Sequence, residues 1–233
     1  MSLRHIRDRD IEESDLQVLI ESQTSEKKLI EFKEILSVDT PDQKKELLGD
    51  VSSFANASGG DLVYGMKATE GRASEVCGLE IDNIDGLKLT LENILRDGLD
   101  PRTPGLSIQP VPLQSSRHAI VIRIPASLAS PHRIKFQDCC RFYSRNSAGK
   151  YILDTSQLRQ AFLLSEDLTK RIRDFRIDRL GKIVSGEMPV SLGPAPRLIV
   201  HLVPLHAFDP VAGVDLSLVA DDPKNRCLIL EAG

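Results

Sequence analysis

Long apolar runs and a secretory leader are both missing from the sequence. The most apolar stretches, 119–124 and 198–203, are far shorter than the roughly 20 residues that a membrane-spanning helix needs. The amino terminus has no charged segment followed by apolar residues, which a secretory signal requires. We therefore expect a cytoplasmic protein of bacterial type that does not bind a membrane.

Cysteine is also scarce, with four residues in a chain of 233. This number and spacing do not make a disulfide framework, which agrees with a reducing compartment. Cys139 and Cys140 are adjacent and follow His132, but neither Cys77 nor Cys227 belongs to a C-x(2)-C pair, so we do not expect structural zinc. Internal repeats and low-complexity tracts are absent as well.

The formal net charge of -4 argues against binding to nucleic acid, because such binding depends on neutralising phosphates. The charge is unevenly distributed, however. Residues 10–50 contain twelve acids and five bases, whereas residues 130–150 contain five bases and one acid. One face can therefore be basic on an acidic molecule, although solvated charges scattered over several faces are an equal alternative. The five bases are Arg133, Lys135, Arg141, Arg145 and Lys150.

The periodicity of apolar residues predicts an α+β fold, with a mixed β-sheet flanked by helices. The clearest helix begins at Thr40-Pro41, a cap followed by proline, and must end near Gly59-Gly60. Further helices are expected at 14–22, around 87–95 and from Asp154 or Thr155 onward. Strands are expected at 29–33, 62–64, 75–79, 106–113, 119–124, 142–145 and 151–153.

The chain is long enough to bury one full core and part of a second. We expect an N-terminal helical segment at 1–22, a main domain at 23–165, and a long amphipathic helix with a linker at 166–196. That helix covers the core, forms a homodimer or lies against nucleic acid, and the sequence leaves these alternatives open. We expect residues 197–233 to be the truncated start of a second domain or strands added to the first.

Four motifs arrive in a fixed order between about residues 14 and 165. The first is EKKLIEFK at 26–33, and the second is VSSFANASGGDLVYG at 51–65. The third is SPH at 130–132, and the fourth is FYSR at 142–145, which Gly149-Lys150 follows. In these motifs the chain resembles the Schlafen AlbA-type domain family. The resemblance implies an AlbA-like fold and a nucleic-acid-binding function.

In the eukaryotic Schlafen branch such domains are metal-dependent endoribonucleases, and the resemblance implies an active-site role for Glu26 and Glu31. Carboxylates that converge on Mg²⁺ or Mn²⁺ activate water, and a lysine such as Lys33 stabilises the developing charge. Alternation along the strand at 29–33 places Glu31 and Lys33 on one face. From spacing alone, the alternative is a solvated face of glutamate and lysine.

A third acid follows the glycine-ending strand in the family's nucleases, and this sequence departs from that pattern. Gly65 is followed by Met-Lys-Ala-Thr, so the nearest candidates are Glu70 in the next turn and Asp61 at the start of the strand. Nuclease activity is therefore the alternative function and not the leading one.

Bacterial members of this family are also labelled as divergent ATPases. A phosphate-binding loop precedes a helix, whereas Gly59-Gly60 follows one. Gly149-Lys150 is followed by tyrosine and does not complete a Walker motif. An ATP-binding regulatory module that uses another route is therefore the second alternative.

The leading hypothesis is a protein that binds DNA or RNA largely through phosphate contacts. Tyr143 adds a ring for stacking beside the basic residues. The predicted nucleic-acid-binding residues are Arg133, Lys135, Arg141, Tyr143, Arg145 and Lys150. The alternative nuclease uses Glu26, Glu31 and Lys33 for catalysis, with Mg²⁺ or Mn²⁺ held by Glu26 and Glu31.

Overall fold

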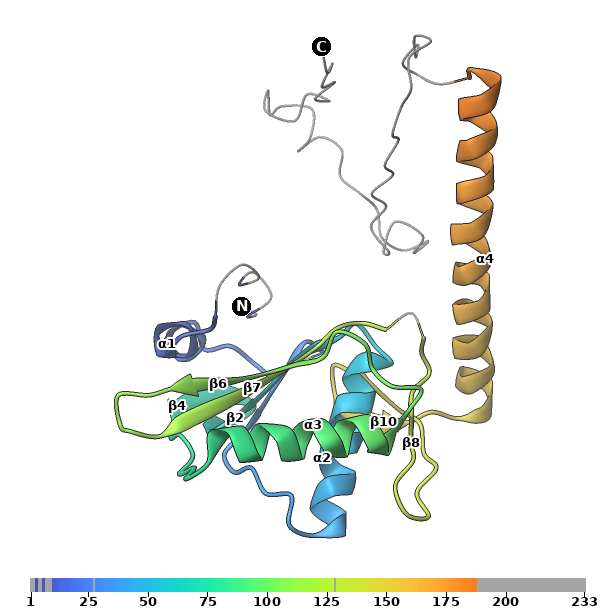
Figure 1. Cartoon of the computed structure of the whole chain (residues 1–233). Helices are drawn as coiled ribbons and strands as arrows, with labels where there is room; N and C mark the ends of the chain where they lie inside the picture. The colour runs from blue at the N-terminus through green and yellow to red at the C-terminus, as the bar shows by residue number, and fades with distance from the viewer. Residues whose placement is uncertain (1–2, 4–5, 7–9, 27, 128, 188–233) are drawn as a thin grey trace, which may run out of the picture. The chain divides into compact units, whose positions relative to one another are not determined.

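The computed structural model describes the chain apart from residues 1–2, 4–5, 7–9, 27, 128 and 188–233 (Figure 1). It divides into a compact unit, Met1–Ser165, and a second unit, Glu166–Gly233. The strands expected within 197–233 fall outside the described residues. No helix of the described part is both long enough and apolar enough to cross a membrane.

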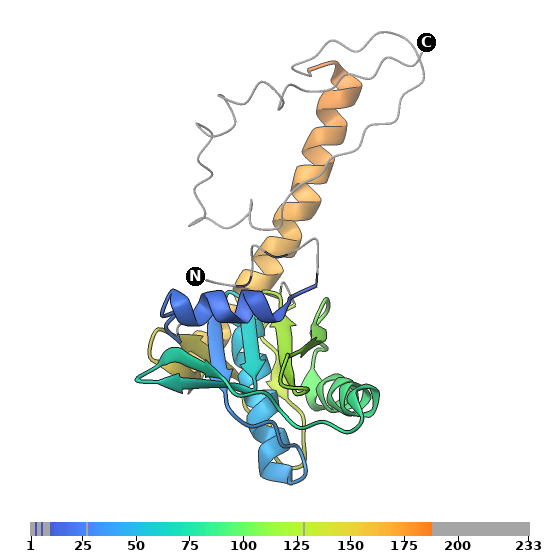
Figure 2. The same ribbon diagram turned by 90° about the vertical axis from the view of Figure 1, so that its left-hand side faces the viewer.

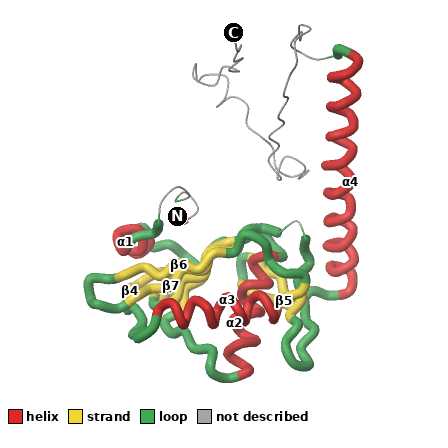
Figure 3. The backbone as a smooth tube through the Cα atoms, viewed as in Figure 1, coloured by secondary structure: helices red, strands yellow, loops and turns green. Residues whose placement is uncertain are grey.

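The helices are spread along the chain, and most of the strands follow one another between them (Figure 3). The helices are α1 (Glu13–Glu21), α2 (Pro41–Ala55), α3 (Ile84–Gly98) and α4 (Thr155–Ser185). The strands are β1 (Ile30–Lys33), β2 (Gly60–Tyr64), β3 (Met66–Thr69), β4 (Arg72–Val76), β5 (Leu99–Asp100), β6 (Ser107–Pro112), β7 (His118–Ile124), β8 (Arg133–Ile134), β9 (Tyr143–Asn146) and β10 (Gly149–Ile152).

The central sheet has four strands in the order β1-β2-β7-β6, with β1 parallel to β2 and the other pairs antiparallel. Its two faces belong to different clusters of the core. Leu62 and Ile122 pack with α2 and α3, whereas Val63 and Val121 pack with α1 and the β3–β4 ribbon. Figures 1 and 2 show α1 on one side of the strands and α2 and α3 on the other. The prediction of an α+β fold with a mixed sheet is confirmed.

The helix α2 and the strand after it follow the sequence signals closely. The Thr40 side chain accepts a hydrogen bond from the Gln43 backbone, and Pro41 occupies the first turn. Gly59 has a φ of +67°, which glycine adopts without strain. A Cβ at Gly60 would lie 2.4 Å from the Phe54 ring, so the chain enters β2 too close to the helix for any side chain. The double glycine is therefore a helix end and a tight strand entry.

The chain departs from the expected strands after β2. Gly65, with a φ of +81°, takes the chain out of the central sheet. β3 then pairs with β4 as a separate two-stranded ribbon, so β4 begins earlier than the strand expected at 75–79. The helices expected from Asp154 or Thr155 and from 166 are one helix of 31 residues, α4. The Asp154 side chain caps its first turn by accepting from the Gln157 backbone N–H. Its apolar side chains Ile177 and Val184 are exposed, and a homodimer through it stays a prediction.

Asn56, at the end of α2, ties distant segments to this helix. Its Nδ2 donates to the carbonyls of His132 and Tyr143 at 2.8 Å each, and its Oδ1 accepts from the His132 backbone N–H at 2.6 Å. The β9–β10 hairpin is consequently held against α2.

Replacing Asn56 with alanine removes three hydrogen bonds and leaves partly buried backbone groups without partners. We expect the free energy of unfolding to fall by about 2–4 kcal/mol, measured by urea denaturation. Asn93→Ala on α3 is the matched control and should leave stability unchanged or slightly higher, because alanine favours helix. A loss below about 0.5 kcal/mol for Asn56→Ala would contradict the bridging role, since that is the ordinary range for surface substitutions.

Candidate functional site

Five of the predicted site residues meet where the β9–β10 hairpin passes over β1 and α2. A cavity of about 260 Å³ opens there. We call it the hairpin pocket, and it is lined by Glu26, Glu31, Gly71, Arg145, Ser147, Ala148, Gly149 and Lys150. Lys33 joins the same ionic network by facing Glu31 at 3.3 Å. The structure therefore brings together the acids and the bases that sequence analysis had assigned to two alternative functions.

Arg145 is the innermost cation of the hairpin pocket. Its side chain is 4% exposed, its Nη2 donates to Glu31 Oε2 at 2.7 Å, and its guanidinium stacks 3.7 Å from the centre of the Phe54 ring. Its Nε and Nη1 are buried and have no hydrogen-bond partner among the described residues. A buried polar group without a partner costs free energy, so Arg145 has two donor nitrogens that the described residues leave unsatisfied.

Asp50 is a site residue that sequence reasoning missed. Its side chain is 2% exposed, and its Oδ1 accepts a hydrogen bond from Lys150 Nζ at 2.5 Å. Its Oδ2 is buried without a hydrogen bond in the described part of the chain, and Lys33 Nζ lies 3.6 Å from it. Asp50 stands four residues before Phe54 on the apolar stripe of α2, and an acid on a buried helix face was the available signal.

Gly49 makes room for the contact between Lys150 and Asp50. A Cβ at Gly49 would lie 3.1 Å from Lys150 Nζ, which is tighter than an ordinary contact. Lys150 can reach the Asp50 carboxylate because the residue before Asp50 on α2 is glycine and has no side chain in the way.

Lys33 is surrounded by carboxylates. Its Nζ donates to Glu46 at 2.8 Å and also faces Glu31 and Asp50. Burial by itself lowers the pKa of Lys33, but Asp50, Glu46 and Glu31 together raise it well above its ordinary value. Lys33 therefore stays protonated at physiological pH and acts as a fixed positive charge, not as a base.

In the Asp50 carboxyl, unlike Lys33, the surroundings disfavour the charged form. Burial and the nearby charge of Glu31 raise the pKa of Asp50 above its ordinary value, against the opposing effects of Lys150 and Lys33. Burial also raises the pKa of the Tyr64 phenol beside it, so that group stays neutral. Ionising Asp50 therefore costs more free energy than ionising a carboxyl group in water.

Glu26 connects the hairpin pocket to the β3–β4 turn. Its Oε1 accepts from the Phe32 backbone N–H at 3.0 Å, and its own N–H donates to the Gly71 carbonyl at 2.7 Å. The two acids proposed as substitutes for the family's third carboxylate do not join it in lining the pocket. Asp61 pairs with Arg123 at 2.9 Å, and Glu70 occupies the turn with a φ of +52°.

The predicted metal ligands Glu26 and Glu31 are engaged by groups of the protein itself. Within the described residues, no three histidine, cysteine, aspartate or glutamate side chains are grouped so that they could hold one. The two oxygens of Glu31 face Arg145 and Lys33. Mg²⁺ or Mn²⁺ at Glu26 and Glu31 stays a prediction, and it requires Glu31 to leave one of these cations.

The other predicted nucleic-acid contacts do not line the hairpin pocket. Arg133 pairs with Asp100 at 2.8 Å, and Lys135 and Arg141 are exposed. Tyr143 is half-buried against the core, and Lys150 Nζ lies 5.5 Å from the centre of its ring. The basic residues of 130–150 are therefore divided between paired cations and two exposed side chains.

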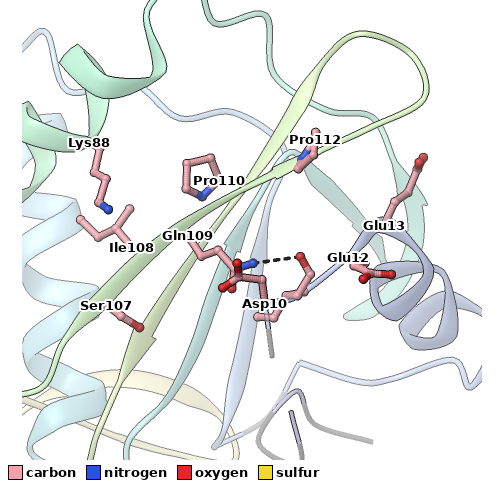
Figure 4. Close-up of a pocket in the computed structure, with 10 residues that line it drawn as sticks. Asp10, Glu12, Glu13, Lys88, Ser107, Ile108, Gln109, Pro110 and Pro112 are labelled. Carbon is pink, nitrogen blue, oxygen red and sulfur yellow. Dashed lines mark hydrogen bonds between the residues drawn. The ribbon is translucent and has the colours of Figure 1, made fainter. Parts of the chain in front are cut away.

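A larger hollow of about 640 Å³ lies at the outer edge of the sheet, between β6, Lys88 of α3 and the residues before and at the start of α1. Figure 4 shows Asp10, Glu12 and Glu13 on one side of it. The Gln109 side chain donates to the Ile11 carbonyl at 2.9 Å. Its rim is acidic, and none of the predicted site residues line it. The hairpin pocket is therefore the better candidate for binding an anion.

Two solved structures are similar to the chain at low sequence identity. The DIP2311 protein from Corynebacterium diphtheriae is 20% identical, with a TM-score of 0.37 over 60% of this chain and 27% of that chain. This chain thus spans only about a quarter of that protein. The N-terminal domain of an ATP-dependent DNA helicase RecG-related protein from Nitrosomonas europaea is 18% identical, with a TM-score of 0.43 over 59% of this chain and 89% of that chain. No curated protein matches the sequence.

The family described as Schlafen, AlbA_2 matches residues 26–154, which is more than half of the 233 residues. The match extends over the whole hairpin pocket, from Glu26 to Lys150, and also includes Asp50 of α2. The chain belongs to the Schlafen, AlbA_2 family.

Proposed function

We propose that this domain binds the phosphate backbone of nucleic acid, with Arg145 and Lys150 as its innermost contacts. Membership of the Schlafen, AlbA_2 family supports nucleic acid as the ligand. The observation that carries the location is the pair of buried, unfilled donors on Arg145 beside a cavity. A guanidinium presents donors in a planar fork that matches two oxygens of one phosphate.

The exposed cations extend this interaction beyond the pocket. Lys135 and Arg141 reach solvent freely, and Arg133 is 40% exposed despite its pairing with Asp100. Contacts of this kind add affinity that depends on salt and not on sequence. The half-buried ring of Tyr143 offers little surface for base stacking, so the proposal includes no base-specific readout.

The depth of Arg145 favours unpaired strands. A guanidinium that is 4% exposed cannot extend to the outside of a rigid duplex, so the phosphate has to enter a space of about 260 Å³. A single strand can bend a phosphate inward, whereas base pairing fixes the duplex backbone.

Replacing both Arg145 and Lys150 with glutamine should weaken binding of a labelled single-stranded oligonucleotide and reduce its dependence on salt. Two lost phosphate contacts lower the slope of log K against log salt by about 1.4, measured by fluorescence anisotropy between ~50 and ~300 mM salt. Lys88→Gln, at the other hollow, is the control and should keep the wild-type slope. An unchanged slope in a folded double variant would rule out the pocket as the binding site.

Single-stranded and duplex forms of one sequence should be bound differently. We expect tighter binding of the single strand by the wild-type protein, because only that form can place a phosphate against Arg145. The difference should disappear in Arg145→Gln. Equal affinities for both forms in the wild-type protein would contradict the recessed contact.

Cleavage of nucleic acid is a second candidate function. It is favoured by the presence of Glu26 and Glu31 in the same pocket as Arg145 and Lys150, with the protonated Lys33 nearby. An ATP-binding regulatory role has no comparable support in the pocket and stays a prediction.

Incubating the protein with tRNA and plasmid DNA, with Mn²⁺ or with EDTA, separates binding from cleavage. We expect binding that persists in EDTA and no cutting, because both oxygens of Glu31 face cations of the protein itself. Glu31→Gln should then change affinity only. Cutting that needs Mn²⁺ and is lost in Glu31→Gln would establish the nuclease instead.

A further inference from the structure

The contact between Asp50 and Lys150 places a buried acid directly beneath the pocket. Asp50 is 2% exposed and does not line the cavity, whereas Lys150 does, with a side chain that is 26% exposed. Lys150 can therefore contact Asp50 and an anion in the hairpin pocket at the same time. Whatever binds at Lys150 acts on the charge of Asp50.

A phosphate in the pocket disfavours the ionised form of Asp50 in two ways. Its negative charge comes close to a carboxylate that is shielded from water, where charges interact strongly. It also draws on the hydrogen bonds of Lys150, the donor to Asp50 Oδ1, while Oδ2 has no hydrogen bond among the described residues. A buried carboxylate that loses part of its hydrogen bonding and counter-charge becomes more stable in the protonated, neutral form.

The neighbouring groups leave Asp50 as the acceptor of that proton. Lys33 of β1 is already protonated, and Tyr64 of β2 is neutral, with a raised pKa. Glu46, also on α2, is the most exposed acid of the cluster, and its hydrogen bond with Lys33 lowers its pKa. The remaining groups are Glu31 of β1, which is paired with Arg145 of β9, and Lys150 of β10.

We propose that Asp50 is a positioning residue of the phosphate site, which holds Lys150 in the empty pocket and takes up a proton when a phosphate binds. This inference rests on the proposed function. The coupling requires the carboxylate to be ionised in the free protein, and the burial that raises the pKa of Asp50 brings its titration closer to neutral pH.

The coupling has a definite sign. Phosphate raises the pKa of Asp50 further, so between the pKa of the free state and that of the bound state each binding event takes up one proton. In that window affinity falls by up to about tenfold for each unit of rising pH, and below it affinity does not depend on Asp50. Asparagine has the same shape and still accepts from Lys150, but it cannot ionise.

The test measures binding of a labelled single-stranded oligonucleotide to the full chain between about pH 5 and pH 8, at constant salt. Asp50→Asn should bind at least as tightly as the wild-type protein at the upper end and should lose the part of the pH dependence that Asp50 causes. Asp138→Asn, at an exposed acid near the basic residues, is the matched control and should keep the wild-type profile.

Calorimetry of the wild-type protein in buffers of different ionisation enthalpy measures the same proton directly and does not depend on the folding of a variant. Uptake approaching one proton per site supports the inference. No uptake, or the same pH profile in a folded Asp50→Asn, overturns it while binding itself stands. Failure of the proposed function has a different signature, in which the oligonucleotide does not bind or binds without regard to Arg145 and Lys150.

Discussion

The site depends on two ion pairs that hold the β9–β10 hairpin against β1 and α2. Arg145 meets Glu31, and Lys150 meets Asp50, with three of these four side chains less than one-fifth exposed. Charges at this depth are tolerated only when they are paired, and removing one partner of a buried pair costs about 3–5 kcal/mol. The pairing therefore fixes the hairpin and at the same time limits what the pocket can bind.

In the proposed function, the same pairs allow an acidic chain to bind phosphate. The family match makes nucleic acid the expected ligand, yet three of the five cations of 130–150, Arg133, Arg145 and Lys150, are paired with carboxylates of the protein. In this account the recessed guanidinium is preorganised by Glu31 and Phe54, and the ligand uses the donors that the protein leaves unfilled. Preorganisation of this kind reduces the cost of ordering a side chain on binding.

Local signals in the sequence were sufficient for most of the fold. The cap at Thr40, the cap at Asp154 and the double glycine each have a local physical cause, and the structure confirms all three. The sequence predicted a strand at 75–79 but not its place in a separate β3–β4 ribbon, because the turn of Gly65 out of the sheet depends on its tertiary neighbours, the His118 carbonyl and the backbone of Gly78.

The site was predictable only in part. Strand alternation placed Glu31 and Lys33 together, and the structure has them 3.3 Å apart. The pairing of Arg145 with Glu31 joins residues 114 positions apart in the sequence, so no local pattern indicates that this cation is already engaged. Asp50 lies on the buried face of α2, which marks it as unusual but does not identify its partner. That partner, Lys150, comes from β10, 100 positions later in the sequence.

A crystal structure of the chain with a bound single-stranded oligonucleotide tests the central claim most directly. The account predicts a phosphate in the hairpin pocket, with its oxygens within hydrogen-bonding distance of Nε or Nη1 of Arg145 and of Nζ of Lys150. A strand bound elsewhere, with the hairpin pocket empty and Arg145 in contact with Glu31 and Phe54 alone, would contradict it.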